Sequence, residues 1–208
     1  AKTGISLTSS TSISVKNNTV DGDVKAPVLG LHSKATITGS TTRSPVPLLE
    51  IPNIDLTPFY TWADNNGEVY NGLSVDTDMT PKGGIIWVNG DAEVSGQAVI
   101  KGSIIATGNI HISGAVNIEP TTCDFGLASR DGDLTVTSSG ILKGLMYARI
   151  GDYNYTANGQ VIGQIMVGGN IGKGGNSDIV LFSKSVPQDP NYGTGYHDHV
   201  VVLGGWHK

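Results

Sequence analysis

Apolar residues recur at a fixed spacing in the middle of the chain, and glycines mark the repeat. Between residues 84 and 114 a glycine stands at every sixth position, and the hexads read GIIWVN, GDAEVS, GQAVIK, GSIIAT, GNIHIS and GAVNIE. Side chains two apart on a strand lie on one face, so each hexad predicts a short strand with one buried stripe. The stripe residues are the second and fourth after each glycine: Ile86, Val88, Ala92, Val94, Ala98, Ile100, Ile104, Ala106, Ile110, Ile112, Val116 and Ile118.

A longer repeat groups the hexads into coils. Segments of the form G-x-φ-φ-φ-x-G-[D/N], with φ mostly apolar, begin at Gly84, Gly102, Gly126, Gly144 and Gly163. The first and third distances between successive starts equal three hexads, and the second equals four. The last distance is three hexads plus a single residue. Short strands at a fixed period predict an all-β, single-domain parallel β-helix, or solenoid, with coils of about 18 residues that bury their apolar faces on one another. We expect the longer steps to carry insertions, one around 120–124 and one near Ile150.

The chain divides into four parts around this solenoid. Residues 83–185 form the central β-solenoid, and residues 1–43 repeat its texture loosely, which predicts N-terminal coils or a cap. Residues 44–82 form a Pro-rich excursion that we expect to pack on one flank or end of the solenoid. Residues 186–208 form an irregular tail that ends in a closing strand.

Three features of these parts give local expectations. The excursion contains a possible short helix that begins near Thr57 and Pro58, because proline suits the first turn of a helix. Trp87 occupies an outward position of its hexad, so we expect the excursion to cover it. The end coils, near residues 5–24 and 163–206, are the expected contact regions of an assembly.

A Gly-Asp or Gly-Asn pair recurs once in each coil. The pairs are Gly90-Asp91, Gly108-Asn109, Gly132-Asp133, Gly151-Asp152 and Gly169-Asn170. Such pairs are typical of a tight corner in which the Asx side chain accepts a hydrogen bond from nearby backbone. The sequence therefore predicts a ladder of corners, and a row of cation ligands is the alternative.

Composition and charge narrow the range of partners. The chain has 208 residues, 29 of them glycine, only 15% charged residues and a formal net charge of −5. Because it has no basic cluster longer than two residues, nucleic acid is not an expected partner. The sequence shows no run of apolar residues long enough to span a membrane, and no cofactor is expected.

Several segments together carry a resemblance to a known family: Ile54–Tyr60, Gly83–Asp91, Val94–Gly96, Ile100–Gly102, Ile104–Ile110, Ile112–Gly114, Ala128–Asp133, Gly144–Ala148 and the strand with Trp206. These segments resemble the solenoid region of PilX-type pilus-assembly-associated proteins of bacteria. A weaker similarity is to bactofilins, which are polymer-forming scaffold proteins. Members of the PilX-type group usually carry an N-terminal pilin-like hydrophobic helix, which this sequence lacks. The resemblance implies an extracellular or cell-surface location in a bacterium, from a processed or truncated precursor, and a structural role without catalytic residues.

Three groups of residues are candidates for binding or chemistry. His197 and His199 have alternating spacing, so both imidazoles could bind one Zn²⁺, with Asp198 or His207 as a third ligand. Asp124, Arg130, Asp131 and Asp133 are the local group that could imitate a β-helix carbohydrate-active enzyme, although a corner ion pair of Arg130 and Asp131 is the simpler interpretation. Aromatic residues could instead form a glycan-stacking surface: Trp62, Trp87, Tyr147, Tyr153, Tyr155, Tyr192 and Tyr196.

The sequence therefore predicts a non-enzymatic structural subunit of a bacterial surface filament or pilus-associated assembly. It would act by self-association as a homo-oligomer or filament, or by docking to pilus or envelope components. A glycan-binding surface adhesin is the alternative, and a β-helix carbohydrate-active enzyme is a third hypothesis.

Overall fold

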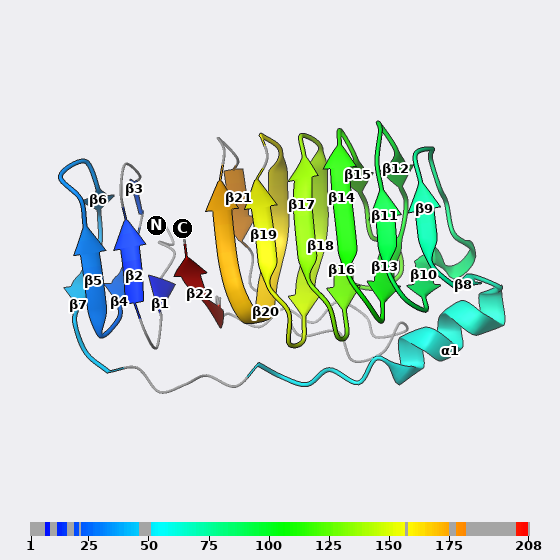
Figure 1. The fold of residues 1–208 in the computed structure, drawn as a ribbon, viewed down its shortest axis with the longest axis horizontal. Coiled ribbons are helices and arrows are strands. Elements are labelled where there is room, and N and C mark those ends of the chain that lie inside the picture. The colour runs from blue at the N-terminus through cyan, green and yellow to red at the C-terminus, as the bar shows by residue number, and fades with distance from the viewer. Residues whose placement is uncertain are drawn as a thin grey trace.

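The computed structural model describes residues 7–8, 12–15, 19–20, 22–45, 51–156, 158–174, 178–181 and 203–207. Within these residues nearly all of the regular secondary structure is strand, and the paired strands run parallel in stacked coils (Figure 1). The expected all-β parallel solenoid is confirmed. No helix in the described part of the chain has the length and apolar character needed to cross a membrane.

The N-terminal residues form a small solenoid with its own core. Val24 pairs with both Leu7 and Thr41, so each coil is a single residue shorter than three hexads and close to the length of the central ones. Ile13, Val15, Val24, Ala26 and Leu29 are buried together inside it. Its strands are β1 (Leu7–Thr8), β2 (Ser12–Val15), β3 (Thr19–Val20), β4 (Val24–Lys25), β5 (Val28–Leu31), β6 (Thr36–Ile37) and β7 (Thr41–Thr42).

The central solenoid follows a short helical excursion. A coil of three hexads is confirmed by register, since Val88 pairs with Ala106 and Ile100 with Ile118. The elements are α1 (Thr57–Asn66), β8 (Val69–Tyr70), β9 (Leu73–Val75), the 3-10 helix η1 (Lys82–Gly84), β10 (Ile85–Val88), β11 (Ala92–Val94), β12 (Val99–Ile100), β13 (Ser103–Ala106), β14 (Ile110–Gly114), β15 (Asn117–Ile118), β16 (Phe125–Ser129), β17 (Leu134–Ser138), β18 (Ile141–Ala148), β19 (Tyr153–Thr156), β20 (Gln160–Gly174), β21 (Asp178–Leu181) and β22 (Leu203–His207).

The inner core of the solenoid is the stripe that the hexads predict. All twelve stripe residues belong to one buried cluster, and each is at most 2% exposed. Later coils extend the cluster with residues such as Leu134, Val136, Tyr153 and Tyr155. Because neighbouring coils supply equivalent residues, the core is a stack of repeated layers.

A second core lies on the outer face of the first strand of each coil. Ile54 and Leu56, together with Phe59 and Ala63 of α1, pack against residues of β10, β13, β16, β18 and β20. Phe59 lies edge-on to Phe125, with ring centroids 5.1 Å apart. These strands are therefore buried on both faces, which explains their continuous apolar runs. The prediction that the excursion packs on a flank of the solenoid is confirmed.

The expected helix is also present, at the predicted start. Pro58 lies in its first turn, and Gly67 ends it in the left-handed conformation with φ 73°. Trp87 is only 5% exposed and packs edge-on against Tyr60, with ring centroids 5.3 Å apart. The excursion thus covers Trp87 as expected.

The register shows where coils differ in length. Ile104 pairs with Leu127 and Ile110 pairs with Leu134, so the second interval is a single residue longer than the first. The extra length was expected around residues 120–124 alone. Instead, one additional residue lies within β16 at Gly126, where the register shifts, one lies at the corner after β16, and the others lie between β15 and β16. The extra residue near Ile150 is confirmed by two strand pairs. Ala148 and its partner Val167 are a single residue further apart in the sequence than Tyr153 and its partner Ile171.

The N-terminal coils and α1 lie at opposite ends of the rod (Figure 1). Strand β22 pairs with β20 and also contacts β2. The two segments expected to contact other molecules, near residues 5–24 and 163–206, therefore meet each other within one chain. Among the described residues, the outermost strands are instead β5, β6 and β7 at one end and β8 and β9 at the other.

Candidate functional site

The candidate site is a groove of about 520 Å³ on the flank of the rod. The extended segment 51–56 is here called the strap. One wall of the groove consists of residues 53–56 of the strap together with Thr57 and Tyr60 of α1. The other wall consists of Trp87 and four polar residues from the solenoid corners. Its volume lies within the range of about 300–1,000 Å³ typical of small-molecule sites.

The strap is held in place by a tyrosine of the outer core. The hydroxyl of Tyr147 donates to the carbonyl of Pro52 at 3.2 Å and accepts the N–H of Ile54 at 3.3 Å. Burial raises the pKa of Tyr147, so the phenol stays protonated and keeps both bonds at physiological pH. Hydrogen bonds to Tyr147 therefore fix one wall of the groove to the solenoid.

The four polar residues form a column, because each is the first residue of a corner in successive coils. They are Asn89, Thr107, Arg130 and Arg149, here called the corner column. Backbone N–H groups of Thr107, Arg130 and Arg149 each donate to the coil before, at 2.9, 2.9 and 3.1 Å. Parallel strands lie about 4.8 Å apart, so residues at this position stack side by side.

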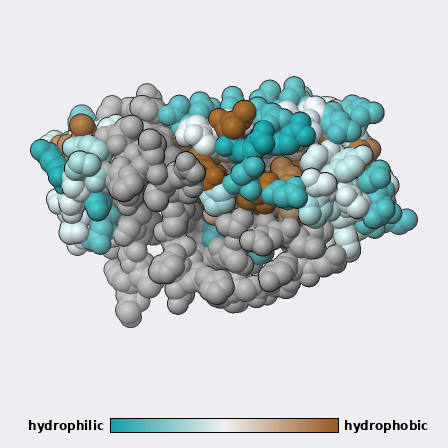
Figure 2. Space-filling view, turned by 90° about the horizontal axis from the view of Figure 1, so that it is seen from below, coloured by the Kyte–Doolittle hydropathy of each residue, from teal (hydrophilic) through white to brown (hydrophobic). Residues whose placement is uncertain are grey.

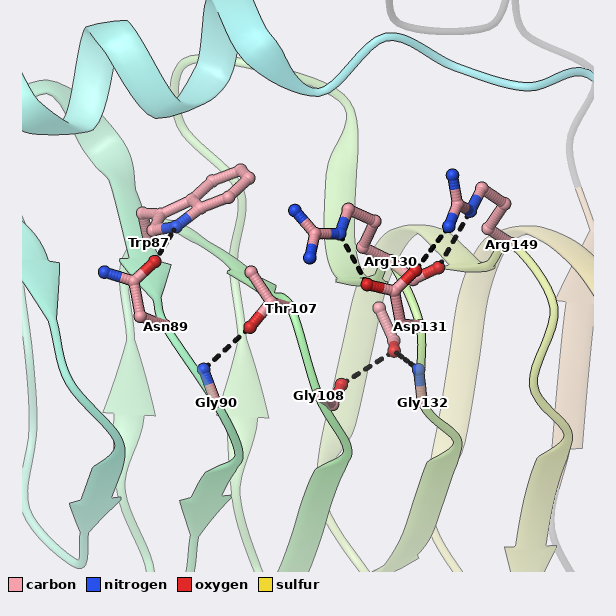
Figure 3. A network of polar contacts seen from close by, with 10 residues as sticks. Trp87, Asn89, Gly90, Thr107, Gly108, Arg130, Asp131, Gly132 and Arg149 are labelled. Carbon is pink, nitrogen blue, oxygen red and sulfur yellow. Dashed lines mark hydrogen bonds and ion pairs between the residues drawn. The ribbon is translucent and has the colours of Figure 1, made fainter.

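The two arginines share one carboxylate. Arg130 Nε donates to Asp131 Oδ2 at 2.6 Å, and Arg149 Nη2 donates to Asp131 Oδ1. Arg149 Nε also donates to the carbonyl of Arg130 at 3.0 Å. Asp131 occupies the position of the extra residue in its corner and lies between the two guanidinium groups (Figure 3). The hydrogen bond from Arg130 and the two positive charges lower the pKa of Asp131.

Further along the corner column, Asn89 and Thr107 also make hydrogen bonds within the protein. The indole N–H of Trp87 donates to Asn89 Oδ1 at 2.9 Å, and Thr107 Oγ1 accepts the N–H of Gly90 at 2.7 Å (Figure 3). On the strap, hydrogen bonds from the hydroxyl and backbone N–H of Thr57 lower the pKa of Asp55. Seen from the strap side, hydrophobic residues of the described surface lie in small areas among hydrophilic ones (Figure 2).

A ladder of Asx side chains runs beside the corner column. Asn109, Asp133, Asp152 and Asn170 each donate a backbone N–H to the side-chain Oδ1 of the preceding coil, at 2.7, 2.9, 2.8 and 2.7 Å, beginning at Asp91. The corner-ladder prediction is confirmed, and its bonds join neighbouring coils. Among the described residues no group of three or more His, Cys, Asp or Glu is placed to hold a metal ion.

The candidate catalytic group is divided between structural roles. Arg130 and Asp131 form the corner ion pair that the simpler interpretation expected. Asp133 belongs to the Asx ladder, where its Oδ1 accepts the N–H of Asp152. The carbonyl of Asp124 accepts the N–H of Leu145. The contacts in this group are those of corners and strands.

The other candidates are spread over the molecule. His197 and His199, Asp198, Tyr192 and Tyr196 lie outside the described residues, so the zinc site stays a prediction. Of the aromatics, Tyr147, Tyr153 and Tyr155 are buried, and Trp62 donates its indole N–H to the carbonyl of Gly83 at 2.9 Å. The glycan-stacking surface expected from these residues is therefore absent from the described part of the chain, apart from the ring of Tyr60, which is 38% exposed beside Trp87.

Sequence reasoning did not single out the corner column or Arg149. The signal was present in the coil motif, because each of these residues occupies the variable position directly after the apolar run. Aligning the motif would have shown Asn, Thr, Arg and Arg at one corner in consecutive coils. The strap wall could not be found in this way, since it contacts coils that are far from it in the sequence. No protein-family model, curated protein or solved structure matches this chain, so the interpretation of the groove depends on its geometry.

Proposed function

We propose that this chain is a non-enzymatic structural subunit of a bacterial surface filament or pilus-associated assembly. Copies associate head to tail through the two ends of the rod. The observation that carries the proposal is the pair of free solenoid ends, which have unpaired strand edges and opposite charge. The resemblance to PilX-type proteins supports a cell-surface location, with pilus or envelope components as further partners.

The strand edges at each end are suited to pairing with another copy. Among the described residues, β5, β6 and β7 each pair on one side only, as do β8 and β9 at the other end. Unpaired N–H and C=O groups on an edge strand are a template for a further strand. Val28 and Leu31 of β5 are exposed large hydrophobic residues. Added coils would cover them.

The inner core is also open at the end formed by β8 and β9. Tyr70, Leu73, Val75 and Met79 pack against the core but are only partly buried. Their equivalents in later coils, such as Val94 and Ile100, are completely buried, because another coil stacks on each side of them. Stacking a second molecule on this end would remove the remaining apolar surface from water.

The charges at the two ends are complementary. Residues 24–45 contain Lys25, Lys34 and Arg43 and no acidic residue. Residues 64–79 contain four acidic residues and no basic one: Asp64, Glu68, Asp76 and Asp78. A basic end that meets an acidic end favours a heterologous, head-to-tail contact, which produces an open filament. Two like ends would repel each other.

Charge-reversal variants test this assembly. Asp64→Lys with Asp76→Lys makes both ends basic, and Lys25→Glu with Lys34→Glu makes both ends acidic. None of these four side chains makes a hydrogen bond or ion pair with a described residue, so we expect both variants to fold. The control is Asn154→Lys, which adds a positive charge at an exposed residue of β19, in the middle of the rod.

The readout is sedimentation velocity across a concentration series, with negative-stain imaging of the same samples. We expect filaments or a ladder of oligomers for the wild type and the control, monomers for each reversed variant alone, and restored assembly when the two are mixed. High salt should weaken assembly of the wild type. A wild type that stays monomeric at every concentration, or variants that assemble alone as well as the wild type, would refute the proposal.

A further inference from the structure

The groove beside the strap is left unused by end-to-end assembly, because it lies on the flank of the rod. Among the described residues, Arg130 uses only its Nε and Arg149 uses its Nε and Nη2. The two terminal nitrogens of Arg130 and the remaining one of Arg149 make no hydrogen bond there. Figure 3 shows the free nitrogen of Arg149 on the side of the strap and the terminal nitrogens of Arg130 on the side of Thr107 and Trp87. The groove therefore presents unused charged donors from two neighbouring coils.

These donors are held in place before any ligand binds. Two guanidinium groups on adjacent coils repel each other, and the carboxylate of Asp131 offsets this repulsion by binding both. Asp131 carries one negative charge against two positive ones, so these three side chains together retain one positive charge. A guanidinium has a planar set of donors that matches a carboxylate, and fixed donors lose little side-chain entropy on binding.

The rest of the groove suits the hydroxyl groups and ring of a sugar. Thr107 accepts a hydrogen bond from Gly90, which leaves its own hydroxyl proton free to donate. The carboxylate of Asp55 on the opposite wall accepts from hydroxyl groups. Tyr60 is 38% exposed and gives an aromatic surface for the apolar face of a sugar ring.

We infer that this groove is a binding site for an acidic saccharide, with the carboxylate of one uronic acid unit on Arg130 and Arg149. The hydroxyl groups of the same or the adjacent unit bind Asp55 and Thr107. A neutral saccharide would leave the arginine donors without an acceptor.

Isothermal titration calorimetry with trigalacturonate tests this site. The matched ligand is the same trisaccharide with its carboxylates methyl-esterified, which keeps the ring hydroxyls and removes the charge. We expect a dissociation constant below about 1 mM for the acid and at least about tenfold weaker binding of the ester. Equal binding of both ligands, or no binding of the acid, overturns the inference.

Variants locate the binding on the protein. Arg130→Gln and Arg149→Gln should each weaken trigalacturonate binding about tenfold or more, because each removes charged donors. Lys143→Gln is the control, since Lys143 is an exposed cation that pairs with Glu119 and is not part of the groove. Circular dichroism and thermal unfolding establish that each variant is folded. Unchanged affinity in both arginine variants, or an equal loss in the control, would refute the assignment.

Two further measurements distinguish the groove from a general anion site and from the assembly interface. Sulfate added as a competitor should displace the trisaccharide only weakly, and full displacement at equal concentration would show a general anion site and overturn the saccharide assignment. The end variant Asp64→Lys with Asp76→Lys should bind trigalacturonate like the wild type. Loss of binding in this monomeric variant would place the ligand at the assembly interface and refute the groove.

Discussion

Replacing Gly114 by alanine tests how closely the corners of the solenoid stack. Gly114 has φ 80°, and a Cβ there would lie 2.3 Å from the carbonyl oxygen of Gly96 in the preceding coil. That same oxygen accepts the N–H of Ala115 at 2.7 Å. The left-handed conformation costs alanine about 1–2 kcal/mol, and loss of the backbone bond costs about 1 kcal/mol more. We therefore expect Gly114→Ala to lower the free energy of unfolding by about 2–3 kcal/mol.

The control is Gly67→Ala at the end of α1. Gly67 has a similar φ of 73°, but a Cβ there would meet no atom within 4 Å. This variant should lose only the conformational part, about 1–2 kcal/mol. Urea unfolding followed by circular dichroism gives both values. A difference between the variants of less than about 0.5 kcal/mol would show that the corners have room for a methyl group, and the stacking argument would be wrong.

Three further predictions concern the cores and the shared carboxylate. Phe125→Ala should lower the free energy of unfolding in urea by about 3–5 kcal/mol, because Phe125 is fully buried against Phe59. It should also expose the strap to limited proteolysis, and a strap that stays uncut would contradict this prediction. Tyr153→Phe should raise the melting temperature, because this buried hydroxyl has no partner among the described residues; a lower value would show that it has one. The lowered pKa of Asp131 means that its stabilising effect is complete above about pH 4 and is lost as the pH falls through that pKa. Asp131→Asn should therefore flatten the pH dependence of melting below about pH 4, and an unchanged profile would count against the pairing.

The regular part of the fold could be predicted from the sequence because its rules are local. The stripe of the hexads, from Ile86 to Ile118, depends only on alternation along short strands and on a fixed coil length. The Asx ladder follows from the same repeat, since a corner that recurs once in every coil brings equal side chains together. The start of α1 at Thr57 required only the residues beside it.

The groove could not be predicted in the same way, because it depends on contacts between distant segments. The strap is fixed by Tyr147, which lies far from Ile54 in the sequence and many coils later. The single additional residue at the corner of Asp131 is hidden in a longer insertion, so its effect on the two arginines appears only in the strand register. The position of the N-terminal coils beside β22 is likewise set by tertiary stacking, since the edge strands of all coils have similar sequences.

The route of the chain has a mechanical consequence. The first and last strands of the described residues lie near each other at one end of the central solenoid, where β22 contacts β2 (Figure 1). Tension applied through the two ends of the chain would therefore load this contact first. The coils between β10 and β20 and the strap would carry no force until β22 separates from the N-terminal coils. In such a subunit the contact between β22 and the N-terminal coils can separate under force while the central solenoid and the groove on its flank keep their shape.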